Sequence, residues 1–141
     1  CERLSLLARN DQRLQIEIIM GGGVMVLHQI MTGDFNMNEP VQEKASEALN
    51  TLLSIADERI ISEFPIVETT TLMMMNFPES PVIQENCMAI LKNLARRGQH
   101  YKVNVANSGG IDICLAMLRK FSSRTLKKEA HELLNELSAY F

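Results

Sequence analysis

The feature that most constrains the fold is a pattern of segments that recurs along the chain. Leu4–Ala8 matches Leu91–Ala95, and Gly22–Val24 matches Gly109–Ile111, each pair lying 87 residues apart. Recurrence at about 40 to 47 residues in helical sequence is typical of stacked helix pairs or triplets, so 87 residues correspond to two periods. Such units cannot bury their apolar faces alone and do so against their neighbours. The pattern therefore predicts an all-α fold.

A third copy lies between these two pairs. Val41–Glu43 recurs as Ile83–Glu85 after 42 positions, and Leu49 and Leu52 recur as Leu91 and Leu94. The leucines are spaced three, four and seven positions apart, which places them on one face of a helix that must be buried. We expect the core to contain Leu49, Leu52, Ile90, Leu91, Leu94, Leu133, Leu134 and Leu137.

Prolines and glycines mark the helix boundaries. Pro40 and Pro81 fit the first turn of two long helices, and Ser80 can cap the second. Gly21–Gly23 and Gly109–Gly110 suit sharp corners between shorter helices, because glycine adopts positive φ after a helix end. In the middle copy Phe64–Pro65 takes this place. The segment before that corner is three residues shorter than in the other copies, which predicts that its first helix loses about one turn.

Shorter helices are expected on both sides of the two glycine corners. The first corner separates 11–20 from 23–32, and the second separates 101–108 from 110–122. The chain also begins halfway through a helical pattern, so we expect a fragment of a longer protein with neighbours at both ends.

Charge and composition exclude several classes of function. Fourteen basic and seventeen acidic residues give a formal charge of -3, whereas nucleic-acid binding needs a basic stripe. No run of 18 apolar residues exists, so we expect no membrane insertion. Cys87 and Cys114 occupy apolar helical positions without metal-ligand spacing, which favours a reducing, cytoplasmic location, with the nucleus as an alternative.

The stretch Ile90–Ala95, followed by Lys102–Ile111 and an apolar helix to Leu118, resembles the armadillo repeat. The likeness covers nearly the whole chain and is strongest over 83–118. It implies a right-handed α-solenoid of about three armadillo-like repeats of three helices each. The expected division of the single segment 1–141 is a third-helix tail at 1–10 and repeats at 11–56, 57–98 and 99–141.

In armadillo proteins the third helices line a groove, and an asparagine near the end of each binds an extended peptide. The matching residue here is Asn93, while Thr51 and Glu136 hold this position in the other copies. The alternative interpretation of Asn93 is a side chain that is solvated or bonded to its own helix. The chain has no tryptophan one turn earlier, so the resemblance implies a protein-binding solenoid but not the nuclear-import peptide site.

The same helix face is acidic. It carries Glu43, Glu47, Thr51, Glu85, Ala89, Asn93, Lys128, Glu132 and Glu136, five of which are acidic. One interpretation is a groove for a basic peptide or basic helix. The other is an ordinary solvated face made of good helix formers.

Other motifs have structural interpretations. Met73–Met75 fills core, with at least one side chain left outside because three consecutive residues cannot all face inward. The basic stretches Arg96–Arg97 and Arg119–Lys120 to Lys127–Lys128 are interpreted as solvated outer faces and as helix C-terminal charges that complement the dipole, with contact to a phosphate or an acidic partner as the alternative. His28, His100 and His131 lack ligand spacing, so we expect no metal and no cofactor.

The sequence predicts that the protein is not an enzyme, because nucleophile, base and oxyanion donors form no recognised motif. We expect a scaffold that binds a protein or peptide along the third helices. The alternative is a structural or regulatory spacer that packs on other domains of its own chain or self-associates.

Overall fold

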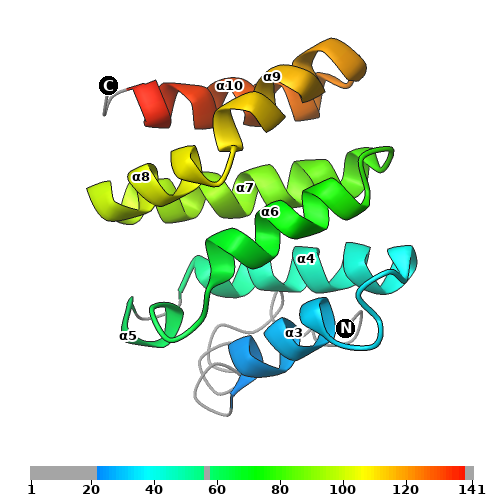
Figure 1. The fold of residues 1–141 in the computed structure, drawn as a ribbon, viewed down its shortest axis with the longest axis vertical. Coiled ribbons are helices and arrows are strands. Elements are labelled where there is room, and N and C mark those ends of the chain that lie inside the picture. Colours follow the sequence, from blue (N-terminus) through cyan, green and yellow to red (C-terminus); the bar gives the residue numbers. More distant parts are fainter. Residues whose placement is uncertain (1–21, 56–57, 139–141) are drawn as a thin grey trace.

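The computed structural model describes residues 22–55 and 58–138, and within them the chain is entirely helical (Figure 1). The expected all-α class is confirmed. The predicted helical segments before residue 22 lie outside the described residues. The helices in the described part are α3 (Gly23–Thr32), α4 (Glu39–Leu53), α5 (Glu58–Ile61), α6 (Ile66–Asn76), α7 (Pro81–Arg97), α8 (Gln99–Asn107), α9 (Gly110–Lys120) and α10 (Arg124–Ser138).

Each of the three long helices starts at a side-chain cap. Asn38 Oδ1 accepts from the backbone N–H of the third residue beyond it at 3.1 Å, and Ser80 and Ser123 do the same at 3.2 and 3.3 Å. Such oxygens satisfy N–H groups that have no partner inside the helix. Pro40 and Pro81 occupy the first turns of α4 and α7, where a missing N–H costs nothing. The predicted helix starts are confirmed.

Two sharp corners depend on glycine. Gly22 and Gly109 both have φ of 90°, a left-handed conformation that side chains with a Cβ rarely adopt. At the second corner a Cβ on Gly110 would lie 2.6 Å from Val105 Cγ1, so α8 and α9 approach too closely for any other residue. In the middle copy Pro65 precedes α6, as predicted.

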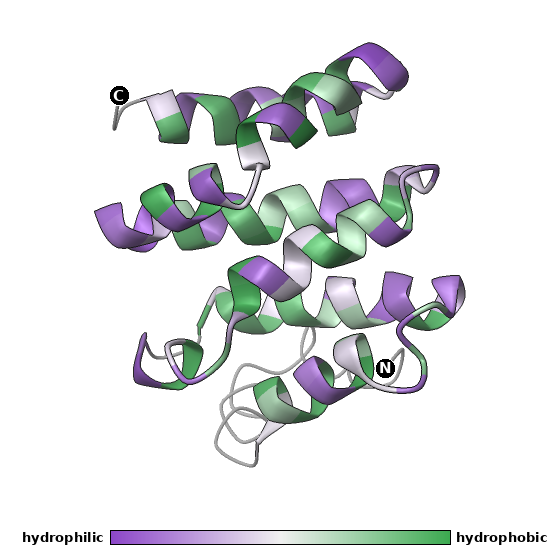
Figure 2. Cartoon of the chain, in the orientation of Figure 1, coloured by the Kyte–Doolittle hydropathy of each residue, from purple (hydrophilic) through white to green (hydrophobic). Residues whose placement is uncertain are grey.

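The long helices α4, α7 and α10 pack side by side in chain order, with α7 between the other two. The shorter α3, α6 and α9 each pack on the long helix that follows, and Figure 1 shows them crossing in front of that layer. α8 packs against α7 and α9. Hydrophobic and hydrophilic residues alternate along most helices in Figure 2, as expected when one side of a helix is buried.

The core lies between these layers and contains seven of the eight residues predicted for it. Each is at most 3% exposed: Leu49, Leu52, Ile90, Leu91, Leu94, Leu133 and Leu137.

Leu134 is the exception, because it is only half-buried. Leu91, 43 positions earlier, lies on α7, which packs against α4, α6, α8 and α10. α10 packs against α7, α8 and α9, and Leu134 lines an open pocket beside Ile111. The expectation of full burial is therefore wrong for this residue.

The methionine cluster behaves as predicted. Met73 and Met74 are buried, whereas Met75 is 67% exposed.

The helix before the middle corner is short. α5 has four residues, whereas its counterpart α8 has nine, so the predicted shortening is confirmed and is larger than expected. None of the described helices is long and apolar enough to cross a membrane.

Two buried glutamines, one on α4 and one on α7, connect these long helices to the end of the short helix that precedes each of them. Gln84 Nε2 donates to the carbonyls of Met74 and Phe77 at 3.0 and 2.9 Å, and Gln42 Nε2 donates to those of Ile30 and Phe35 at 3.1 and 2.8 Å. Both glutamines are fully buried. These bonds satisfy carbonyls that a helix end or turn would otherwise leave without a partner. In the third copy the position holds Lys127, which is exposed.

Candidate functional site

The residues predicted to form a binding face occupy equivalent bands on three parallel-packed helices. Those on α4, α7 and α10 are all half-buried except Lys128, which is exposed: Glu43, Glu47, Thr51, Glu85, Ala89, Asn93, Glu132 and Glu136. Half-burial follows from their helical spacing, since they flank the fully buried leucine stripe. They form a band along the edges of neighbouring helices.

At the contact of α7 with α10, the carboxylates are neutralised by cations from α7. Lys92 Nζ lies 2.8 Å from Glu129 Oε2 and 2.5 Å from Glu132 Oε2, and Arg96 Nε donates to Glu136 Oε1 at 2.8 Å. We call these five residues the α7–α10 seam. Two of the predicted acidic site residues, Glu132 and Glu136, are thus engaged in ion pairs within the chain.

The seam shifts the ionisation of its members. Burial alone would lower the pKa of Lys92, but hydrogen bonds and charge attraction from Glu129 and Glu132 outweigh it and raise that pKa above its usual value. The hydrogen bond from Lys92 holds the pKa of Glu132 below its usual value. Both side chains therefore stay charged near neutral pH.

The contact of α4 with α7 is made by amide and hydroxyl groups. Asn86 Nδ2 donates to Ser46 Oγ at 3.1 Å and to the carbonyl of Glu43 at 3.4 Å. Among residues 22–55 and 58–138, the Glu43 carboxylate has no ion-pair partner, and Glu47 pairs with Lys44 of its own helix at 3.8 Å. Among the described residues, the Glu43 carboxylate on α4 therefore differs from Glu132 and Glu136 on α10, which both pair with cations of α7.

The remaining predicted residues have local partners. Thr51 Oγ1 donates to the carbonyl of Glu47 at 3.0 Å, and Glu85 Oε1 accepts from Ser123 Oγ at 3.0 Å. Asn93 Oδ1 accepts from Arg97 Nε at 3.1 Å. The Asn93 side chain is half-buried at the helix edge and is not enclosed between helices.

The sequence interpretation of Arg96–Arg97 as solvated helix-end charges is confirmed for the exposed Arg96 in the last turn of α7 and needs correction for Arg97. Arg96 pairs with Glu136 on the neighbouring helix, and half-buried Arg97 donates from Nη2 to the carbonyl of Leu53 at the end of α4. These bonds were missed because their acceptors lie 40 and 44 residues away. The sequence signal that could have found them is the period itself, since each partner lies about one period away.

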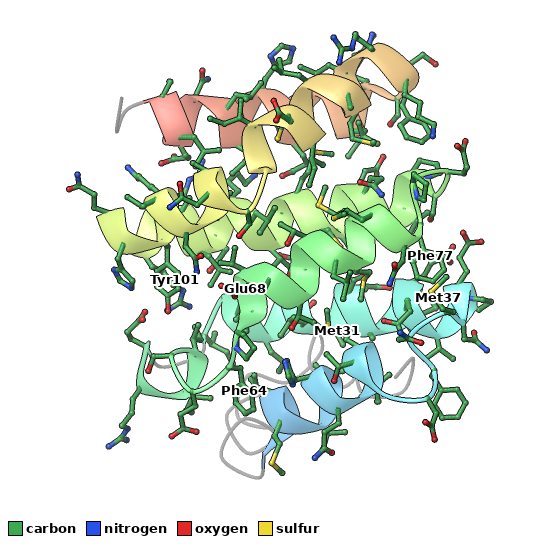
Figure 3. The ribbon with its side chains drawn as sticks, viewed as in Figure 1. Met31, Met37, Phe64, Glu68, Phe77 and Tyr101 are labelled. Carbon is green, nitrogen blue, oxygen red and sulfur yellow. The ribbon has the colours of Figure 1, made fainter. Side chains whose placement is uncertain are left out.

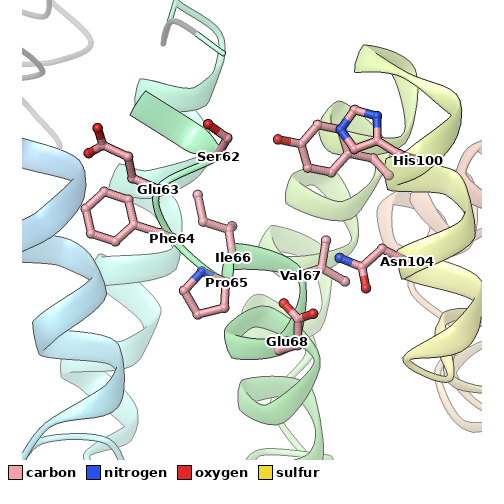
Figure 4. Close-up of a pocket in the computed structure, with 10 residues that line it drawn as sticks. Ser62, Glu63, Phe64, Pro65, Ile66, Val67, Glu68, His100 and Asn104 are labelled. Carbon is pink, nitrogen blue, oxygen red and sulfur yellow. The ribbon is translucent and has the colours of Figure 1, made fainter. Parts of the chain in front are cut away.

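An open pocket of about 360 Å³ lies on another part of the molecule, where the α5–α6 corner faces α8 (Figures 3 and 4). Its lining comes from 62–68 and from His100, Tyr101 and Asn104, with no residue of α4, α7 or α10. Figure 4 shows Val67, Glu68 and Asn104 close together on one side of it.

Tyr101, at the edge of this pocket, donates its hydroxyl to Glu58 Oε1 at 2.6 Å. Burial, aided by the bond to Glu58, raises the pKa of Tyr101 to about 12. The phenol is therefore a neutral hydrogen-bond donor at physiological pH, with its proton committed to Glu58.

The cysteines are structural, as the sequence predicts. Cys87 and Cys114 are both buried and free. Burial raises the pKa of the Cys87 thiol well above its usual value and raises the pKa of Cys114 to about 12. A thiol with a raised pKa is a poor nucleophile.

The histidines contact neighbouring helices or solvent. His28 lies 3.1 Å from Thr69 Oγ1 and 5.3 Å from the Phe64 ring, whereas His100 and His131 are exposed. In the described part of the chain, no three histidine, cysteine or acidic side chains are grouped so that they could hold a metal ion.

In comparisons with known proteins, no family model, no curated protein and no solved structure matches the chain.

Proposed function

We propose that the chain is a segment of a right-handed, armadillo-like α-solenoid and that it acts as a non-catalytic scaffold for protein binding. The observation that supports the solenoid is the spacing of its long-range hydrogen bonds. Nine side-chain bonds join residues 38 to 44 positions apart, which is one sequence period. Bonds at one period are expected when each unit of a solenoid contacts only its neighbours.

The binding surface in this proposal is the band on α4, α7 and α10. Stacked units provide a long open surface, and the band presents carboxylates at regular intervals along it. Because the Glu43 carboxylate has no ion-pair partner among residues 22–55 and 58–138, the α4 end offers negative potential to a ligand. At the α10 end Lys92 and Arg96 already occupy the carboxylates. We propose that a basic peptide or basic helix binds with its cations toward α4.

Asn93 lies in the middle of this surface and is suited to orient a peptide backbone. Its Oδ1 is used by Arg97, which leaves the amide group as a donor to a peptide carbonyl. The half-buried armadillo-type position and the neighbouring acidic residues support one continuous binding surface. The compartment that follows from a reduced, buried pair of cysteines is the cytoplasm or nucleus.

The test is binding of a labelled lysine- and arginine-containing peptide selected on an array, measured by fluorescence anisotropy at several salt concentrations. We expect the double variant Glu43→Gln, Glu47→Gln to bind several-fold more weakly and with a smaller salt dependence. Asn93→Ala is expected to lose affinity while its free energy of unfolding changes by no more than about 0.5 kcal/mol.

The matched control is Glu63→Gln, Glu68→Gln, which removes the same charge from two exposed side chains at the other pocket. It should leave affinity unchanged. If both double variants weaken binding equally, the affinity depends only on the net charge of the protein, and the assignment of the binding surface to the band is wrong. An affinity that does not change with added salt would likewise contradict an acidic groove.

The second candidate function, a spacer that packs on other domains or self-associates, is favoured by a separate observation. An apolar pocket of about 290 Å³ remains open beside α9 and α10. Size-exclusion chromatography discriminates between the candidates, since saturable peptide binding by a monomer supports the first and oligomers without ligand support the second.

A further inference from the structure

Of the three equivalent positions at the centre of the band, only Asn93 keeps a hydrogen-bond donor for a ligand. Thr51 Oγ1 already donates to the carbonyl of Glu47 at 3.0 Å. The Glu136 carboxylate accepts from Arg96 and has no donor of its own. Asn93 Nδ2, by contrast, has no hydrogen-bond partner in the part of the chain that the structure describes. The orientation of this one amide group therefore determines what the centre of the band can recognise.

The contact with Arg97 fixes that orientation. Arg97 Nε donates to Asn93 Oδ1 at 3.1 Å. A guanidinium has five N–H donors and no acceptor, so the amide oxygen must face Arg97. In a planar amide the nitrogen lies on the opposite branch, and it therefore points away from Arg97. A flipped amide would lose the charge-assisted bond and would place N–H groups against a cation.

The guanidinium of Arg97 is itself held by other elements. Its Nη2 donates to the carbonyl of Leu53 at the end of α4, and its Nη1 lies 3.7 Å from Glu58 Oε2 on α5. Glu58 Oε1 in turn accepts from the hydroxyl of Tyr101 on α8 at 2.6 Å. The ends of α4 and α7 lie at the same edge of the molecule as α5 and the start of α8 (Figure 1). Groups from three other elements thus place the one side chain that orients Asn93.

The ligand chemistry follows from this arrangement. We propose, building on the proposed function, that Arg97 is a positioning residue of the band and makes Asn93 select a hydrogen-bond acceptor, which in an extended peptide is a backbone carbonyl. Lysine at this position would keep the charge, but its single nitrogen on a flexible stem lacks the planar fork that serves several acceptors at once. Arg97→Lys therefore separates positioning from charge.

Positioning is measured first without a ligand, from the side-chain amide signals of Asn93 in heteronuclear NMR of the 141-residue protein. The signals are assigned by their loss in Asn93→Ala. We expect them to shift in Arg97→Lys, because the amide loses the guanidinium that fixes it, and to stay in place in Arg119→Lys. Arg119 is exposed in the last turn of α9, so this control makes the same substitution away from the band.

The labelled basic peptide then tests recognition by fluorescence anisotropy. Arg97→Lys should weaken binding about fivefold, as for the loss of one hydrogen bond, whereas Arg119→Lys should leave affinity unchanged. In the Asn93→Ala background Arg97→Lys should have no further effect, because a residue that acts only through Asn93 has nothing left to position. Asn93→Asp adds a negative charge but removes the N–H donor, so it should also bind more weakly than the wild type.

Circular dichroism and the unfolding midpoint check that the variants fold. If Arg97→Lys does not fold, Glu58→Gln takes its place. That substitution removes one contact of Arg97 without touching Asn93, and it should shift the Asn93 signals and weaken binding about twofold.

Three results would overturn the proposal. The first is Asn93 amide signals or an affinity that Arg97→Lys leaves unchanged. The second is a loss of affinity for Arg97→Lys that is equally large in the Asn93→Ala background, because Arg97 then acts through charge or stability. The third is tighter binding by Asn93→Asp, which would mean that the site recognises charge and not a donor. A wild type that binds no basic peptide contradicts the proposed function, and the NMR comparison alone then decides whether Arg97 positions Asn93.

Discussion

The α7–α10 seam and the α5–α6 corner differ in whether their carboxylates are paired with cations. In the seam, Glu129, Glu132 and Glu136 are each paired with Lys92 or Arg96. At the corner, the exposed Glu63 and Glu68 have no ion-pair partner in the described part of the chain.

The difference follows from helix length. α7 and α10 are 17 and 15 residues long, so several turns of one lie beside several turns of the other. α5 has four residues, too few to extend along α8, and a pocket remains between the corner and that helix. Matched helix lengths give several side chains a partner one period away, whereas the shortened α5 keeps such a bond at Glu58, to Tyr101, and the corner leaves Glu63 and Glu68 in solvent.

The largest effect is expected from a core leucine of the regular stack. Leu91→Ala or Leu94→Ala should lower the free energy of unfolding by about 2 to 5 kcal/mol, because both side chains are 0% exposed. Phe64→Ala at the corner removes a larger but half-buried ring and should cost less than half as much. Urea denaturation measures both. A larger loss for Phe64 would mean that the corner, and not the stack, carries the stability.

The next effect concerns the buried glutamine. Gln84→Ala should cost about 1 to 3 kcal/mol, because it leaves the carbonyls of Met74 and Phe77 without their donor. Lys127→Ala, at the exposed counterpart on α10, should stay within about 0.5 kcal/mol. Thermal and urea unfolding of the two variants provide the comparison. Equal costs would show that the glutamine is not a structural connection.

A smaller effect is expected from the seam itself. Lys92→Met should lower the urea midpoint by less than Gln84→Ala does, because the seam is partly hydrated. The pKa of Glu132 is depressed in the folded chain, so its contribution is present above its unfolded pKa and is lost as pH falls through the folded value. The wild type should therefore lose more stability on acidification than Lys92→Met.

At alkaline pH, the contribution of the seam to stability changes with pH in the opposite direction. The pKa of Lys92 is raised, so its contribution is present below the unfolded pKa and is lost as pH rises through the folded value. Glu68→Gln removes an exposed carboxylate that has no ion-pair partner among the described residues, so it is the control for the loss of one charge and should not reproduce the pH profile of Lys92→Met. Identical pH profiles of stability for wild type and Lys92→Met would contradict the ion pairs assigned to the seam.

The smallest effect at neutral pH is expected at Tyr101. Tyrosinate absorbance should show a phenol that titrates near pH 12 and disappears in Tyr101→Phe. Because this pKa is raised on folding, the associated stability is constant below the unfolded value and is lost between about pH 10 and 12. A single titration of all phenols near pH 10 would contradict the bond to Glu58.

Much of the helix pattern could be predicted because it depends on local chemistry. The caps at Ser80 and Pro81, the glycine corner at Gly109 and the buried face of α7 are each set by neighbours within a few positions. The candidate band could be predicted only as a set of positions. Its charge balance could not, because Glu132 and Glu136 find their cations 40 residues earlier.

The sequence by itself determined the helical class, the period near 43 residues and all but one of the core residues expected. These follow from apolar spacing on single helices and from the backbone limits of proline and glycine. Only the tertiary structure decided which charges pair, that Gln42 and Gln84 connect adjacent helices, and that Leu134 stays half-exposed. Those outcomes depend on the offset between helices and on how many helices surround each one, and residue spacing along a single helix contains neither quantity.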